Sequence, residues 1–275
     1  MPIMATKWVV WVTFLVMLSA LAPSAARAGT ASASVNVSII PTGGIQVVQG
    51  VLYGWSPPCS NSYSYTLPTP VKPGSAIMGA AQWEAPPGCN GGSPDVITLG
   101  SQQATVLRTI YPGNFGFDNC CPSATSFILF NVSGSQSSFT IKSSNGGLFS
   151  PPVGLLAEVS GFSGGASVDA FNGNFTNAAG TGIDALTSGP ITPSRVGDFL
   201  YGFQVSTYSN LGALSAGTGW TAGPNYGVCP DPNCTLHPNQ DEYILNYNST
   251  NPISATFSTT NGSGEWPTGI IAVKP

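Results

Sequence analysis

Apolar and polar residues alternate in short runs along most of this chain, and one run departs from that pattern. The stretch from Val153 to Phe162 reads Val-Gly-Leu-Leu-Ala-Glu-Val-Ser-Gly-Phe, and its one charge is Glu158. Continuous apolar character is typical of a strand that is covered on both faces. Pro151-Pro152 and Gly164-Gly165 bound the run. We therefore predict a central strand here, buried on both sides.

Other segments show the period of two that is typical of half-buried strands. No segment after the first 28 residues shows an apolar period of 3.6 over three turns. Long stretches rich in Pro, Gly and Cys separate the strands, and the stretch from Trp55 to Pro73 is expected to be an irregular loop. This pattern predicts an all-β fold, a two-sheet antiparallel sandwich of the jelly-roll kind. Strands are expected near residues 35–39, 45–53, 75–83, 96–99, 104–111, 126–132, 138–142, 167–171, 182–186, 198–205, 243–247, 253–257 and 265–273.

The first 28 residues have the pattern of a signal peptide. Lys7 supplies a positive charge, residues 8–21 are apolar, and Ala26-Arg27-Ala28 gives a small-x-small cleavage pattern. We predict cleavage after Ala28 and a single domain over residues 29–275, with a retained N-terminal anchor as the alternative. No second hydrophobic stretch of membrane length follows. The mature chain is therefore predicted to be secreted, without membrane insertion.

The charge balance excludes some partners. Without Lys7 and Arg27, five cations face eleven carboxylates, which gives the mature chain a net charge of −6. Nucleic acid is an unsuitable partner because there is no basic cluster to displace counterions. An anionic membrane surface is disfavoured for the same reason.

All cysteines lie in the predicted mature region, and an even number in an exported chain indicates disulfides. Six cysteines allow 15 pairings. We expect a local Cys229–Cys234 bridge, with the remaining four paired among themselves to brace the loops. A vicinal bond would be strained. A metal site built from Cys229, Cys234 and His237 is the alternative, but it needs thiolates that export tends to oxidise. The six are Cys59, Cys89, Cys120, Cys121, Cys229 and Cys234.

Several motifs resemble, in order, those of a widespread group of exported bacterial β-sandwich proteins. Residues 70–83 are similar to its "V-x-A-G-N-x-L-V-V-x-V-x-W" opening, residues 156–161 to its "A-x-E-Y-S-G" strand, and residues 197–202 to its "G-D-L-L-V-G" strand. Residues 217–221 resemble its "G-x-G-W-T" turn, and 240–243 and 266–275 its "E-D-x" and "W-x-x-x-x-x-A-F-K-P" endings. The resemblance implies a secreted jelly-roll-like domain and supplies no catalytic set. The cysteine-containing loops depart from the pattern, so a function particular to this chain could lie in them.

One motif suggests a hydrolase. Gly161-Phe-Ser163-Gly-Gly165 fits G-x-S-x-G, and Asp184 or Asp198 and then His237 follow in the order of α/β-hydrolases. That motif works at an elbow between a strand and a helix, above a parallel sheet. No helical pattern follows Ser163, so we interpret the motif as a glycine-rich turn.

Three carboxylates are candidates for glycoside cleavage. Glu158 interrupts an apolar strand, where a charge must be paired, hydrogen-bonded or neutralised. We expect it to pair structurally with Arg195 or Arg108. As an alternative, it could act as a general acid with Glu242 or Asp241. The Asp241-Glu242 pair would also suit a structural calcium site, although no cofactor is required by the pattern.

Aromatic residues in or beside the expected loops suggest recognition, because a flat ring stacks on the apolar face of a sugar. The sequence therefore favours non-catalytic binding of carbohydrate or another cell-surface component. A structural or adhesive surface protein with a protein partner is one alternative, and an extracellular glycan hydrolase is another. The candidate binding residues are Trp55, Tyr63, Tyr65, Trp83, Tyr111 and Trp220.

Overall fold

A computed structural model describes residues 44–54, 59–83, 93–110, 123–149, 152–178, 186–205, 214–228, 238–259 and 264–275. Contacts divide the chain into Met1–Ser38 and Ile39–Pro275, and every described residue lies in the second unit. The predicted signal peptide and the strand expected near residues 35–39 lie outside the described ranges. Within those ranges the chain forms strands only, and no helix there is long and apolar enough to cross a membrane.

The strands confirm the all-β prediction. They are β1 (Gln46–Tyr53), β2 (Ser62–Val71), β3 (Ala76–Trp83), β4 (Pro94–Leu99), β5 (Gln102–Gln103), β6 (Thr105–Ile110), β7 (Ser123–Leu129), β8 (Gln136–Ser143), β9 (Val153–Ser160), β10 (Ser167–Ala178), β11 (Leu186–Thr187), β12 (Asp198–Gln204), β13 (Leu214–Ala216), β14 (Thr221–Val228), β15 (Pro238–Tyr247), β16 (Thr256–Thr259) and β17 (Gly264–Lys274).

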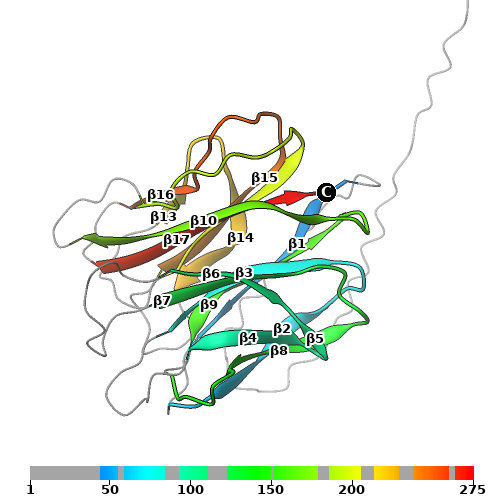
Figure 1. Cartoon of the computed structure of the whole chain (residues 1–275), viewed down its shortest axis with the longest axis vertical. Coiled ribbons are helices and arrows are strands. Elements are labelled where there is room, and N and C mark those ends of the chain that lie inside the picture. Colours follow the sequence, from blue (N-terminus) through cyan, green and yellow to red (C-terminus); the bar gives the residue numbers. More distant parts are fainter. Residues whose placement is uncertain are drawn as a thin grey trace, which may run out of the picture. The chain divides into compact units, whose positions relative to one another are not determined.

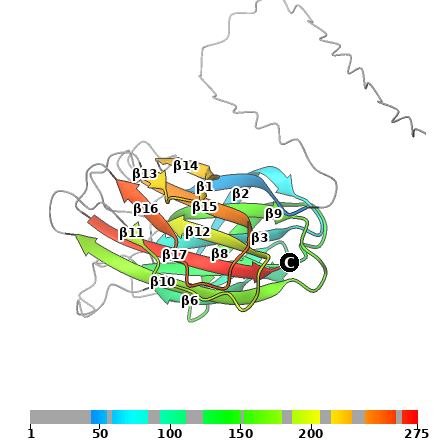
Figure 2. The ribbon, with the colours of Figure 1, turned by 90° about the horizontal axis from the view of Figure 1, so that it is seen from above.

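These strands form four antiparallel sheets, where the sequence predicted two. Sheet 1 has the order β2-β8-β4-β5 and sheet 2 the order β1-β9-β3-β7-β6. Sheet 3 has the order β10-β17-β12-β15-β14, which Figure 2 shows from above, and sheet 4 the order β11-β16-β13. Figure 1 shows the four sheets as successive layers of the described part of the chain.

Three apolar clusters fill the spaces between the layers. Between sheets 1 and 2, Phe139 and Ile141 meet Phe127 and Leu156. Between sheets 2 and 3, side chains of β3, β7 and β9 meet those of β12 and β17. Between sheets 3 and 4, Phe257 packs with buried side chains of β12 and β17. Sheets 2 and 3 are therefore covered on both faces.

This stacking explains the uninterrupted apolar runs. Seven of the eight residues of β9 are buried, as predicted for the segment from Val153. Every residue of β3, β7 and β12 is buried as well. A strand with layers above and below it has no face for polar residues, so its sequence loses the period of two.

One predicted loop is a strand. Residues 55–73 were expected to be irregular, but Ser62–Val71 forms β2 at the edge of sheet 1. Pro68 and Pro70 suggested a break in regular structure. A proline is tolerated in an edge strand, where its missing N–H is not needed by a neighbour, and the pairing with β8 is irregular between Thr66 and Val71.

Candidate functional site

The three candidate catalytic carboxylates are fully buried, and each lies in a different interlayer. Glu158, Asp241 and Glu242 all have 0% exposure. Glu158 lies on β9 opposite Ile77, whose side chain belongs to the cluster between sheets 1 and 2. Asp241 and Glu242 are consecutive residues of β15, so they project from opposite faces of sheet 3.

Uncharged groups supply the hydrogen bonds of the Glu158 carboxyl. Its Oε1 accepts hydrogen bonds from the Ser75 hydroxyl at 2.8 Å and the Lys72 backbone N–H at 3.0 Å. Its Oε2 accepts one from Gln49 Nε2 at 2.6 Å, and the same Nε2 donates to the backbone oxygen of Thr69 on β2. The carboxylate thus links sheet 2 to the β2–β3 connection.

The predicted ion pair of Glu158 with Arg195 or Arg108 was wrong. Arg108 Nη1 donates instead to Asn172 Oδ1 at 2.8 Å, and Arg195 contacts Asp198. The reason is positional, because the residues that surround Glu158 come from β1 and from the chain between β2 and β3.

Asp241 faces sheet 2. Its Oδ1 accepts a hydrogen bond from the Asn225 backbone N–H at 2.9 Å, and its Oδ2 accepts bonds from Asn225 Nδ2 at 2.8 Å and Tyr201 Oη at 3.1 Å. Asn225 Nδ2 also donates to the backbone oxygen of Leu156 on β9. Burial raises the pKa of Asp241 to about 7 against these hydrogen bonds. The group joins sheets 2 and 3.

Glu242 faces sheet 4. Its Oε2 accepts a hydrogen bond from the Gly217 N–H at 2.7 Å, and its Oε1 accepts one from the Thr256 N–H at 2.9 Å. Burial raises the pKa of Glu242 to about 8, although both hydrogen bonds act in the opposite direction. The Glu242 side chain lies against Gly202. A Cβ added at Gly202 would lie 2.9 Å from Glu242 Cγ and 2.6 Å from Ala255 Cβ.

These positions suit structural links better than chemistry. A glycosidase needs two carboxyl groups flanking one substrate bond in an accessible cleft, and these three are sealed in separate layers. Asp241 and Glu242 point to opposite faces and could not ligate one calcium ion. Among the described residues, no three or more His, Cys, Asp or Glu side chains gather in a way that could hold a metal ion.

The G-x-S-x-G motif lies in a turn between two strands. Ser163 is exposed, its backbone oxygen accepts a hydrogen bond from the Ala166 N–H, and β10 follows. No helix begins there, in agreement with the interpretation as a glycine-rich turn. Asp184 and His237 lie outside the described residues.

Three of the six candidate binding aromatics pack on the cluster between sheets 1 and 2. Tyr63 and Tyr65 lie on β2, and their hydroxyls donate to the backbone oxygens of Phe149 and Pro152. Trp83 ends β3 and is 7% exposed. Trp220 packs against the cluster between sheets 3 and 4. The described aromatics therefore do not share one exposed face, and Trp55 and Tyr111 lie outside the described ranges.

Cys59 is the only cysteine within the described ranges, and it is disulfide-bonded. The other five, Cys89, Cys120, Cys121, Cys229 and Cys234, lie outside those ranges. The expected Cys229–Cys234 pairing therefore stays a prediction.

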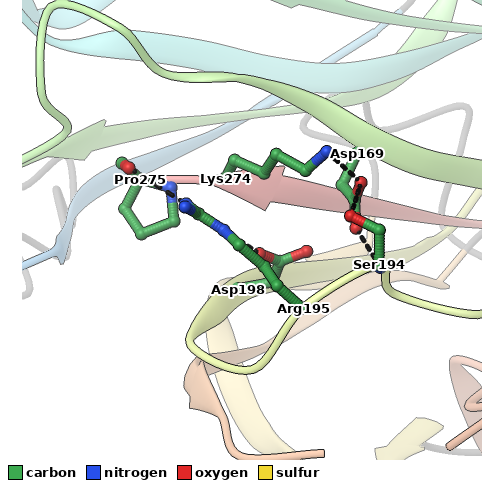
Figure 3. A network of polar contacts seen from close by, with 6 residues as sticks. All are labelled: Asp169, Ser194, Arg195, Asp198, Lys274 and Pro275. Atoms are coloured by element: carbon green, nitrogen blue, oxygen red, sulfur yellow. Dashed lines mark hydrogen bonds and ion pairs between the residues drawn. The ribbon is translucent and has the colours of Figure 1, made fainter. Parts of the chain in front are cut away.

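A polar network ties the ends of three segments together (Figure 3). Lys274 Nζ lies 2.6 Å from Asp169 Oδ1, and the Ser194 hydroxyl donates to the same oxygen at 2.7 Å. Arg195 contacts Asp198 at 3.3 Å and donates to the Pro275 backbone oxygen at 3.1 Å. Burial favours a higher pKa for Asp169, but the bonds from Lys274 and Ser194 hold it well below its usual range. Burial and the neighbouring Asp169 raise the pKa of Asp198.

Replacing Asp169 with asparagine should destabilise the protein by about 1 kcal/mol near neutral pH, because the ion pair with a partly exposed lysine is lost. A depressed pKa contributes stability above the pKa of the unfolded chain, and that stability is lost as pH falls through the folded value. The difference between wild type and Asp169→Asn should therefore shrink below about pH 4. Denaturant unfolding at several pH values measures it, with Lys274→Met as the matched variant. A difference that grows on acidification would contradict the assignment.

A row of neutral polar side chains crosses sheet 3, and it was not predicted from the sequence. Thr268 on β17 is the register partner of Gln204 on β12, and Gln204 is also the partner of Gln240 on β15. At the edge of the sheet, Asn174 on β10 is the partner of Thr268. The sequence feature that could have indicated this row is Gln204, a polar residue between Phe203 and Val205 in an otherwise apolar strand. We call these four residues the polar row.

Comparisons with known proteins give no relatives for this chain. No family, no curated protein and no solved structure matches it.

Proposed function

We propose that this chain is a secreted, non-catalytic protein that binds neutral carbohydrate or a similar uncharged component of a cell surface. The observation that carries the proposal is the polar row, whose buried amide and hydroxyl groups have hydrogen-bonding atoms without partners. Glu158, Asp241 and Glu242, by contrast, each accept hydrogen bonds from neighbouring segments. Most of the described buried polar atoms that lack a hydrogen-bond partner therefore belong to uncharged groups.

The resemblance to exported bacterial jelly-roll-like proteins supports the same proposal. Its motifs at residues 156–161, 197–202 and 266–275 fall on β9, β12 and β17, in the two covered sheets. The residues that carry the resemblance therefore lie mostly in these two sheets. Binding specificity would come from features particular to this chain, with disulfide-braced loops around the sandwich.

A glycan array probed with the labelled mature chain tests this function. We expect binding to a subset of neutral glycans that changes little with salt, because uncharged partners are not screened. No reducing ends should be released from bound glycans during incubation. Absence of glycan binding, or turnover of a glycan, would contradict the proposal. Self-association in light scattering, without glycan binding, would instead support an adhesive protein.

A further inference from the structure

The polar row lies on the face of sheet 3 that turns towards sheet 4. Ile270 and Ala272 of β17 belong to the cluster between sheets 3 and 4, and Thr268 shares their face because side chains alternate along a strand. Directly paired residues of antiparallel strands share a face, so Gln204, Gln240 and Asn174 point the same way. Trp266 lies two residues before Thr268, also on this face.

Five polar atoms of this group are buried and have no hydrogen-bond partner. They are both side-chain polar atoms of Gln204, Oε1 of Gln240, Oγ1 of Thr268 and Nε1 of Trp266. An unpaired polar atom in a protein interior is costly, and a native structure normally supplies a partner, a water or a ligand. Five such atoms around adjacent register positions are too many to be independent defects. They indicate a place that takes a polar occupant.

The chemistry of the atoms defines the occupant. Gln204 offers one donor group and one acceptor, Thr268 a hydroxyl that does both, and Trp266 a donor only. The row itself carries no charged group. The nearest carboxyl on this face, Glu242, already accepts from Gly217 and Thr256. Adjacent hydroxyls of a sugar ring both donate and accept, and they match paired amides without a charge. An anion or a cation would find no counter-charge in the row.

We propose that the polar row, together with Trp266, is the saccharide-binding site, and this rests on the proposed function. The four members of the row differ in exposure, and Gln240 is 3% exposed. Gln204 and Thr268 are 0% exposed, whereas Asn174 at the β10 edge is exposed. Asn174 is thus the member of the row that solvent reaches, and the β10 edge is the side from which a sugar would enter.

Apolar substitutions in the polar row test whether its unpaired atoms bind a sugar or are only an unfavourable feature of the core. In Thr268→Val and Gln204→Leu, the unpaired atoms disappear while shape is largely kept, so the sugar-free protein should be at least as stable as wild type. Saccharide affinity should fall about tenfold or more because the sugar loses hydrogen-bond partners. Thr125→Val is the matched control, since Thr125 is equally buried but its hydroxyl pairs with Thr109 Oγ1. It should leave affinity unchanged.

The probes are D-glucose, D-galactose, D-mannose and N-acetyl-D-glucosamine, titrated separately and followed by the indole N–H resonance of Trp266, which Trp266→Phe assigns. We expect at least one sugar to shift this resonance saturably in wild type and in Thr125→Val, but far less in Thr268→Val. If no sugar shifts it, the site assignment is wrong. If arrayed glycans bind wild type and Thr268→Val equally, the assignment is wrong while the proposed function stands. A stable Thr268→Val with unchanged sugar response would likewise overturn it.

Discussion

Raising the pH from about 5 to about 9 should lower the free energy of unfolding of this protein by several kcal/mol, because two buried carboxyl groups must then ionise. Asp241 and Glu242 lie on opposite faces of β15, with pKa values raised by burial to about 7 and about 8. In the unfolded chain such groups lose their protons near pH 4.

The sign of the effect follows from proton binding. Between about pH 4 and pH 8, the folded protein holds protons that the unfolded chain has released, so rising pH favours unfolding. The contribution is complete below the unfolded pKa values and is lost as pH passes through the folded ones. Asp169 acts in the opposite direction, but only at acid pH, since its pKa is depressed. Stability should therefore be greatest between about pH 4 and pH 6.

Denaturant titrations at pH 5, 7 and 9 would measure this slope, at fixed ionic strength and with disulfides intact. Asp241→Asn cannot ionise and should show a shallower decline. Glu242→Gln should also decline less, although it begins less stable because its amide nitrogen faces the N–H of Gly217 or Thr256. The interpretation fails if wild type and Asp241→Asn lose stability in parallel between pH 5 and 9.

The covered strands were predictable from the sequence, and the number of layers was not. A run such as Val153 to Ser160 shows that both faces of a strand are buried. It cannot show whether a helix, a loop or another sheet provides the cover. Sheets 1 and 4 are built from strands of ordinary alternating pattern, and β11 and β13 have only two and three residues. Such short strands carry too few positions for a period to be detected.

The candidate site was harder to predict because it depends on register. Glu158 could be identified as a buried charge, but its partners Gln49 and Ser75 are 109 and 83 residues away in sequence. Thr268 and Gln204 become neighbours only through the pairing of β12 with β17. Tyr63 and Tyr65 were assigned to a loop, but they lie on β2 and their hydroxyls donate to the backbone oxygens of Phe149 and Pro152. Aromatic residues in the expected loops suggested recognition, whereas the polar row is brought together by strand pairing.

Replacing Glu158 with alanine should cost about 3–5 kcal/mol, from the hydrogen-bond donors left without an acceptor and the cavity left behind, which is a large part of the stability of an ordinary domain. The change leaves the Ser75 hydroxyl, the Lys72 N–H and Gln49 Nε2 without their shared acceptor inside the protein. It also leaves a cavity between sheet 2 and the β2–β3 connection. Glu158→Gln is the matched control, because it retains one oxygen for Ser75 and Lys72 and should cost only about 1–2 kcal/mol.

A double-mutant cycle with Gln49→Ala separates the network from the cavity. If Gln49 and Glu158 act as one link, the double variant should be less destabilised than the two single changes predict, by about 1 kcal/mol or more. Purely additive losses would mean that the 2.6 Å contact between Gln49 Nε2 and Glu158 Oε2 contributes nothing. A cost for Glu158→Ala no greater than that for Glu158→Gln would show that Glu158 does not hold the β2–β3 connection to sheet 2. The carboxylate would then be free for another role, and its assignment as a structural link would be wrong.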